Sequence, residues 1–275
     1  MVQLCFNAFN GSRYLGAGID LPTQISAAAA AGFPYFGPDL YSLDAWMDDG
    51  HSLAALADHL VANGMRCWEL AAGLALGSRA ESIAAARHAA KIAAVLRPAW
   101  VQIYAGAPTD RETPAILAEV CDVLAPTGAR IAIEYMPFSP LASILDTYRL
   151  VEDVGFDRAR VLIDTWHHFR GADSDADLQT VPLEAIAYIQ FDDALPIISD
   201  DLQDETVNRR TFPGDGEFDL NGFCAGMKNK GFDGMVSVEI INAEWRERDI
   251  FEFAKRAFVS TVRFWQSAKG QGARP

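Results

Sequence analysis

The sequence predicts a single (β/α)8 barrel, and three observations lead to this fold class. Short apolar runs rich in β-branched residues alternate with longer alanine-rich amphipathic segments along the 275 residues, which is the pattern of strand–helix units repeated on a parallel sheet. Eight such runs recur at a spacing of roughly 34 residues, as a closed barrel requires. The first run is followed by NGSRYLG, which lacks the GxGxxG turn that an open doubly wound sheet more often shows. An open α/β sheet is the alternative topology.

The eight predicted strands follow one another without a linker. Each is a short run of apolar residues, many of them β-branched or aromatic, as buried parallel strands require. These strands cover residues 2–9, 35–40, 66–72, 100–106, 130–138, 160–166, 187–194 and 235–242. Alanine-rich helical stretches lie between them, and several end at a glycine before the next strand, as in VANG, APTG, EDVG and KNKG. We therefore expect one barrel domain over residues 1–275, with a frayed tail at 267–275.

Composition argues against several classes of protein. Half of the residues are hydrophobic, but no apolar run approaches the roughly 20 residues of a membrane span, so we expect a soluble protein with no membrane partner. The net charge of -14 would repel a phosphate backbone, which argues against a nucleic-acid partner. The four cysteines form no CxxC or CxxH pair, so neither a zinc knuckle nor a disulfide framework is expected. The N-terminus has no basic region or cleavage site, which favours a cytoplasmic location.

Polar residues end four neighbouring predicted strands, and in a (β/α)8 barrel the chemistry gathers at these C-terminal ends. Each is embedded in apolar sequence, IAIEYM, VLIDTW, YIQFDD or VSVEII, where an unpaired buried carboxylate would be costly. Converging carboxylates of this kind must share a cation or protons. The residues are Glu134 on the fifth strand, Asp164 on the sixth, Gln190 with Asp192 on the seventh, and Glu239 on the eighth.

The ligand atoms that these strands offer favour a hard divalent cation. Glu134, Asp164, Gln190 and Glu239 all present oxygen, which suits Mg²⁺ or Mn²⁺ better than Zn²⁺, because zinc prefers imidazole and thiolate. The expected cofactor is therefore one divalent cation, Mg²⁺ or Mn²⁺. The alternative for each carboxylate is a structural ion pair with an arginine. The five lysines all fall in predicted helices or the tail, so a Schiff-base aldolase or a pyridoxal enzyme would lack its amine.

Three cationic side chains are candidates for contact with a substrate. His167 follows the strand-six aspartate by three positions and can reach toward a bound substrate, whereas His168 should face aside and be structural. Arg209 and Arg210 lie in the long polar segment 195–220, which we expect to cover the site. Either guanidinium could bind a substrate carboxylate or hydroxyls, with a solvated loop arginine as the alternative. The motif PGDGEF in this segment is interpreted as a turn.

Together these segments resemble the xylose-isomerase-like TIM-barrel superfamily of sugar isomerases, epimerases and dehydratases. The similarity covers essentially the whole chain. The resemblance implies that Glu134, Asp164, Gln190 and Glu239 bind one divalent metal and that His167 contacts the substrate. The segments that carry it are IEYMPF, LIDTWHHFRG, IQFDDA, PGDGEFDLNGF and GMVSVEIIN.

The function expected first is a divalent-metal-dependent sugar or cyclitol isomerase or epimerase that acts through a metal-stabilised enediolate. In it Glu134 and Glu239 would carry protons and His167 would polarise or deprotonate the substrate. The alternative is a dehydratase of the 3-dehydroshikimate dehydratase type. Gln190 favours it, because many isomerases and epimerases of the family have histidine there. The small-molecule partner is then a polyhydroxy ketone or a hydroxy acid.

Two more distant functions remain as alternatives. An endonuclease-IV-like DNA repair enzyme uses the same barrel, but it needs a multi-metal histidine cluster and a basic face, and this sequence shows neither. A non-catalytic accessory subunit would leave the strand-end acids without a chemical task. A homodimer is compatible with such a barrel, and nothing in the sequence requires one.

Overall fold

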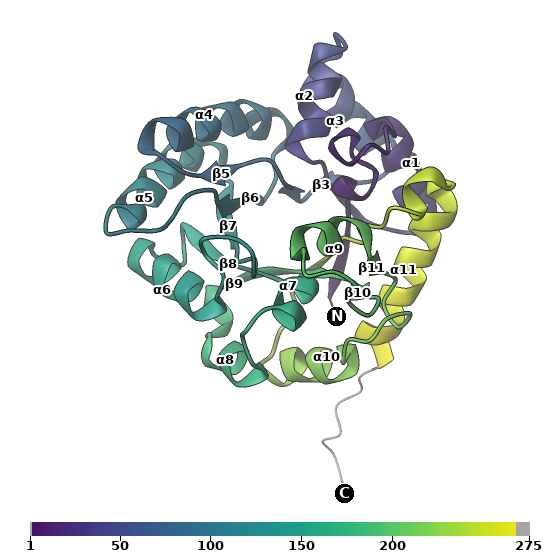
Figure 1. The fold of residues 1–275 in the computed structure, drawn as a ribbon. Helices are drawn as coiled ribbons and strands as arrows, with labels where there is room; N and C mark the ends of the chain where they lie inside the picture. Colours follow the sequence, from purple (N-terminus) through teal and green to yellow (C-terminus); the bar gives the residue numbers. More distant parts are fainter. Residues whose placement is uncertain (1, 268–275) are drawn as a thin grey trace, which may run out of the picture.

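The computed structural model describes residues 2–267, in which helices surround a nearly closed barrel of parallel strands (Figure 1). The predicted frayed tail, 267–275, lies outside these residues except for Ser267. The order of the parallel strands is β3-β2-β1-β12-β9-β8-β7-β6-β4, and the short β5 pairs with β6. The bounds are β1 Gln3–Asn7, β2 Tyr35–Gly37, β3 Arg66–Cys67, β4 Glu69–Leu70, β5 Ala75–Leu76, β6 Trp100–Ala105, β7 Arg130–Glu134, β8 Ala159–Asp164, β9 Ile186–Phe191 and β12 Met235–Val238.

The barrel closes through β3 and β4, which are two pieces of one strand on either side of Trp68. β3 pairs with β2, and β4 pairs with β6. The Trp68 amide donates to the carbonyl of Phe36 at 3.0 Å, and the Trp68 carbonyl accepts from the amide of Ala99 at 2.8 Å. Hydrogen bonds therefore continue across the break on both edges, and the eight predicted strands correspond to the eight barrel positions.

Eleven α-helices of the described chain accompany the strands, and most of them form the outer ring (Figure 1). The glycines predicted to end four of the helical stretches all have positive φ, at 69° for Gly64, 81° for Gly128, 101° for Gly155 and 91° for Gly231. None of the described helices is long and apolar enough to cross a membrane. The helices are α1 Leu21–Ala31, α2 Leu40–Asp48, α3 Leu53–Ala62, α4 Arg79–Leu96, α5 Thr113–Leu124, α6 Ile144–Val154, α7 Thr165–Arg170, α8 Asp175–Thr180, α9 Leu202–Asn208, α10 Leu220–Asn229 and α11 Ile250–Ser267.

The alternation of side chains along the strands builds the interior of the barrel in layers. A lower layer is apolar and buried, and consists of Cys5, Trp100, Ala132, Leu162, Tyr188 and Met235. On five of these strands, the side chain two residues further along also faces inward, and for β12 the corresponding side chain is four residues further along. These side chains are Asn7, Gln102, Glu134, Asp164, Gln190 and Glu239. The interior of the barrel is therefore apolar in the lower layer and polar at the C-terminal ends of the strands.

The segment after β9 contains more regular structure than the sequence indicated. Its polar composition predicted an irregular loop, but it holds α9 and a two-stranded antiparallel pair, β10 Asp193–Ala194 with β11 Arg210–Thr211. The helix forms because the Asp201 carboxylate caps its first amides and Glu205 pairs with Arg209 one turn later. Side chains of α9 line the cavity at the barrel mouth, so the segment does cover the site.

Candidate active site

A cavity of about 170 Å³ opens at the C-terminal ends of the barrel strands. One wall is aromatic, where Tyr14 stacks on Tyr41 with ring centroids 4.2 Å apart and Phe9 lies beside both. Glu134, His167, Arg210 and Glu239 supply the charged or titratable lining other than tyrosine among the described residues. Asp164 and Gln190 are fully buried and do not line the cavity. The structure therefore brings six of the seven predicted site residues to one end of the barrel.

Local structure fixes the direction of two of the acids. Asp164 ends β8 and caps α7, since its Oδ1 accepts hydrogen bonds from the amides of Trp166 at 2.7 Å and His167 at 3.2 Å. This leaves Oδ2 for the site. Glu239 follows β12, and the Asn10 side chain bonds the backbone on both sides of it, to Val238 and Ile240.

Arg210 places a buried cation among the carboxylates. Its Nη1 lies 2.7 Å from Asp164 Oδ2, 2.8 Å from Asp192 Oδ2 and 3.1 Å from Glu239 Oε2. Nε and Nη2 donate to the backbone and hydroxyl of Thr206. Charge-assisted hydrogen bonds of this kind hold the guanidinium firmly, so Arg210 is committed to protein groups rather than free to meet a ligand.

The pKa values of the three carboxylates diverge around this arginine. Burial opposes ionisation of Asp164, but Arg210 and His167 outweigh it and hold the pKa of Asp164 below its usual value. Burial raises the pKa of Glu239 well above its usual value, and burial with the neighbouring Asp164 charge does the same for the pKa of Asp192. One arginine cannot neutralise three buried acids, so the cluster has room for a further cation or for protons.

Glu134, Asp164 and His167 form the tightest group of candidate ligands. One ligand atom from each lies within 4.8 Å of the others, and His167 Nε2 is 3.3 Å from Glu134 Oε1. All three are buried. His167 therefore stands beside the acids as well as beside the cavity.

The side chain of Gln190 shows whether the strand-end residues suit a bound cation. Its Nε2 donates to Glu239 Oε1 and to Gln102 Oε1, each at 3.2 Å. Its Oε1 is buried and has no hydrogen-bond partner within residues 2–267. A buried oxygen without a donor next to ionisable acids is what a hard cation would use, so the residues fit one.

Two positions in the site were not predicted from the sequence, Asn7 on β1 and Gln102 on β6. Asn7 Nδ2 donates to Glu239 Oε1 at 2.9 Å, and Gln102 Nε2 donates to Glu134 Oε2 at 2.7 Å. Both are polar side chains inside apolar runs, QLCFN and WVQIYA, which is the signal that could have identified them.

Arg209 and His168 point away from the cavity. Arg209 Nε pairs with Glu205 at 3.0 Å and its Nη2 donates to the carbonyl of Pro196, so it does not line the site. His168 packs on Phe223 and lies 3.2 Å from Asp175, in agreement with the structural task expected for it.

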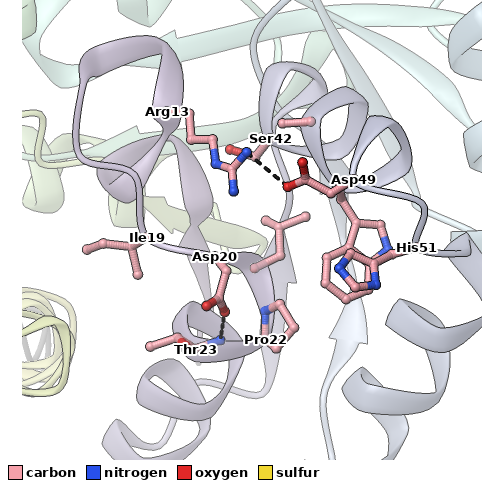
Figure 2. Close-up of a pocket in the computed structure, with 11 residues that line it drawn as sticks. Arg13, Ile19, Asp20, Pro22, Thr23, Ser42, Asp49 and His51 are labelled. Atoms are coloured by element: carbon pink, nitrogen blue, oxygen red, sulfur yellow. Dashed lines mark hydrogen bonds and ion pairs between the residues drawn. The ribbon is translucent and has the colours of Figure 1, made fainter.

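A larger cavity, about 450 Å³, lies at the edge of the molecule between α1 and α2 (Figure 2). Three of its charged side chains already have protein partners. Arg13 pairs with Asp49 at 3.0 Å, and the Asp20 carboxylate accepts a hydrogen bond from the amide of Thr23. Both members of the ion pair are half exposed. Volume alone does not make this cavity a reactive site, and the smaller cavity holds the buried acids.

Comparison with known proteins supplies a family and several relatives. A sequence model of the xylose isomerase-like TIM barrel family matches residues 25–261. An inosose isomerase of Halalkalibacterium halodurans is 28% identical over 149 residues, which is 54% of this chain and 52% of that protein. A 3-dehydroshikimate dehydratase of Pseudomonas putida is 28% identical over 120 residues, 43% of this chain and 19% of that protein.

The chain therefore spans about half the length of the curated inosose isomerases that it matches. Among solved structures, it superposes on an IOLI protein that binds a zinc atom, with a TM-score of 0.86 and 22% identity, over 97% of this chain and 99% of that one. Identity at this level shows a shared fold.

Proposed function

Because the chain belongs to the xylose isomerase-like TIM barrel family, we propose that it is a divalent-cation-dependent isomerase or epimerase of a neutral sugar or cyclitol ketone. The observation that carries the proposal is the pair of buried acids, Glu134 and Glu239, which line one cavity beside the partner-free oxygen of Gln190. Two carboxylates that line one cavity are suited to moving a proton between neighbouring carbons.

The charge of the cavity favours a neutral substrate. Arg210 is the only arginine or lysine among the described residues that line it, and its Nη1 already contacts three carboxylates. Apart from the proposed cation, a substrate carboxylate would meet no uncommitted arginine or lysine in the described lining, and it would face Glu134 and Glu239. Hydroxyl groups could bond these acids, while the ring of a cyclitol could pack against the aromatic wall.

A bound divalent cation, held by Glu134, Asp164, Gln190 and Glu239, would polarise a substrate carbonyl and its neighbouring hydroxyl. Glu134 or Glu239 then removes the proton from the adjacent carbon and returns it to the other carbon or the other face. The substrate is rearranged without gain or loss of atoms.

Two further side chains, His167 and Arg210, support this proton transfer. His167, beside Glu134, bonds the substrate oxygen whose charge changes during the transfer. Arg210 keeps Asp164 ionised throughout. Because the four proposed ligand residues all offer oxygen atoms, we propose Mg²⁺ or Mn²⁺ as the cation.

A dehydratase of the 3-dehydroshikimate type is the second candidate. Gln190 supports it, since the resemblance to those dehydratases includes a glutamine at this strand end, and the Pseudomonas putida relative carries that name. Expulsion of a β-hydroxyl after the same proton removal would give a dehydrated product. We rank this candidate second because the described cavity lining offers the carboxylate of such a substrate no uncommitted arginine or lysine.

The test is proton exchange in heavy water. Protein stripped with a chelator is supplied with Mn²⁺, Mg²⁺ or Zn²⁺ and incubated in D₂O with an inosose or a ketohexose. We expect proton NMR to show loss of the C–H signal next to the carbonyl and growth of a second ketone, both only with the cation and both abolished by Glu134→Gln. Glu119→Gln, an exposed acid on α5, is the matched control that should retain the activity.

A parallel incubation with 3-dehydroshikimate separates the two candidates. Growth of an aromatic ultraviolet band there, with no exchange in any neutral ketone, would overturn the isomerase proposal and establish the dehydratase. Neither exchange nor a band, in protein shown to be folded, would contradict both.

A further inference from the structure

Gln102 connects the two halves of the candidate active site. It lies on β6 at the third of six strand residues, is 4% exposed, and lines the cavity. Its Nε2 donates to Glu134 Oε2 at 2.7 Å, while its Oε1 accepts from Gln190 Nε2 at 3.2 Å and from the backbone amide of Ala72 at 3.1 Å. It thus joins the Glu134 side of the site to the Gln190 side.

The partners of Gln102 determine which way its amide points. A backbone amide can only donate, so the group facing Ala72 must be the oxygen of Gln102. The nitrogen of Gln102 is then the group that faces Glu134, and it donates to Glu134 Oε2. A flipped amide would lose the bond to the Ala72 amide.

The orientation of the Gln102 amide also determines the orientation of the Gln190 amide. Because Gln102 presents its oxygen, Gln190 must turn its own nitrogen toward Gln102, and the same nitrogen also meets Glu239 Oε1. The oxygen of Gln190 is the atom that remains, and it lacks a partner throughout the described chain. A glutamine that turned the other way would present N–H groups, which cannot bind a cation.

The backbone at Ala72 supports the first step of this chain. Ala72 has φ 41°, a left-handed conformation that residues other than glycine seldom adopt, and Gly73 follows at φ 95°. Both residues line the cavity. This strained turn directs the Ala72 amide at the side chain of Gln102 and so allows the hydrogen bond between them.

We propose that Gln102 is a positioning residue: it holds Glu134 and turns the Gln190 amide so that the Gln190 oxygen is left available to bind a cation. The inference rests on the proposed function, because it concerns the same site, and it gives the β6 residue a task there.

Cation affinity measured without substrate tests the inference. Wild-type protein and Gln102→Met are stripped of metal and titrated with Mn²⁺, with bound and free Mn²⁺ distinguished by electron paramagnetic resonance. Loss of a residue that orients metal ligands typically weakens binding about 10- to 100-fold, and we expect a loss in this range. Gln24→Met is the matched control, since Gln24 is also buried and donates to the Ile19 carbonyl just before α1 rather than to the acids, and it should leave Mn²⁺ affinity unchanged.

A double-mutant cycle then isolates the turning of the amide. Gln190→Leu removes that amide, so Gln102→Met should cost clearly less Mn²⁺ affinity in the Gln190→Leu background than in the wild type. Equal losses in the two backgrounds would show that Gln102 acts only on Glu134 and would overturn the amide-turning part.

The remaining outcomes separate this inference from the proposed function. If folded Gln102→Met binds Mn²⁺ as tightly as the wild type, the inference fails while the proposed function stands. If the wild-type protein binds neither Mn²⁺ nor Mg²⁺ nor Zn²⁺, the proposed function fails and the inference fails with it.

Discussion

The Arg210 guanidinium lies where three buried carboxylates meet, and its side chain is 2% exposed. Removing one partner of a buried ion pair costs much more than the pair contributes, because the remaining charge is left without compensation. Asp192, which is fully buried and also accepts from the Thr165 hydroxyl, anchors the arginine. Arg210 is therefore a structural counter-ion of the buried acids, and it also lines the cavity.

We expect Arg210→Met to lower the free energy of unfolding of cation-free protein by about 3–5 kcal/mol, since Asp164, Asp192 and Glu239 lose their shared cation. Urea denaturation monitored by tryptophan fluorescence measures this. The control Arg149→Met breaks an exposed pair with Asp146 and should cost less than about 1 kcal/mol. Equal losses for the two variants would contradict the burial argument.

Among the elements, the turn after β11 is held by one buried acid. The two carboxylate oxygens of Asp193 accept hydrogen bonds from the backbone amides of Ala194, Gly214, Gly216 and Phe218, at 2.9 to 3.1 Å. A side chain on Gly216 would collide with the Ala194 carbonyl and with Asp193 itself. The PGDGEF motif is thus the turn that the sequence predicted, and it keeps β11, and so Arg210, in place beside β10.

Replacing Asp193 with Ala should free this turn, because four amide donors lose their acceptor at once. We expect a loss of at least about 2 kcal/mol in unfolding free energy and faster hydrogen exchange at Gly214, Gly216 and Phe218. Mass spectrometry of peptic fragments follows the exchange. Asp215→Ala, which removes an exposed partner of Arg256 in the same turn, is the control and should leave the exchange unaltered. Protection that persists in Asp193→Ala would show that packing, not this carboxylate, holds the turn.

For the molecule as a whole, an acid inside the barrel makes stability depend on pH. Glu69 on β4 is fully buried, accepts a hydrogen bond from Ser237, and occupies the space that a side chain at Gly37 would need. Burial raises the pKa of Glu69 from 4.5 to about 7. The folded protein therefore keeps a proton that the unfolded chain releases above about pH 4.5, and this contribution to stability is lost as pH rises toward 7.

The size of the pH effect follows from the two pKa values of Glu69. The difference corresponds to about 3 kcal/mol of unfolding free energy, which is lost progressively from pH 4.5 and is lost completely above about pH 7. Because other buried acids, such as Asp192 and Glu239, also have raised pKa values, the measured quantity is the difference between wild type and Glu69→Gln, which mimics the protonated acid. We expect the unfolding free energy of the variant to fall less steeply over this range. Parallel curves for the two proteins would contradict the assignment to Glu69.

The strands and their polar ends could be predicted from the sequence because both are local patterns. Apolar runs with a period of two mark Glu134, Asp164, Gln190 and Glu239 as the residues that follow or end buried strands, and the barrel then brings them together. Gln102 and Asn7 show the same signal, a polar residue in an apolar run, but they were not predicted, since a neutral amide indicates chemistry less strongly than a buried carboxylate does. That the whole chain forms one domain, and that the protein is cytoplasmic, remain predictions.

The sequence by itself determined the barrel, the order of its strands and the acids at their ends, because alternation, glycine caps and residue type act over a few neighbouring residues. Only the tertiary structure decided which arginine faces the acids, which glutamine orients which, and how far apart the carboxylates lie. Arg209 and Arg210 are adjacent in the chain and alike in chemistry, yet the β10–β11 pairing sends one to Glu205 and the other into the site. Such choices depend on contacts between residues far apart in the chain, up to 88 positions for Gln102 and Gln190, and no local pattern encodes them.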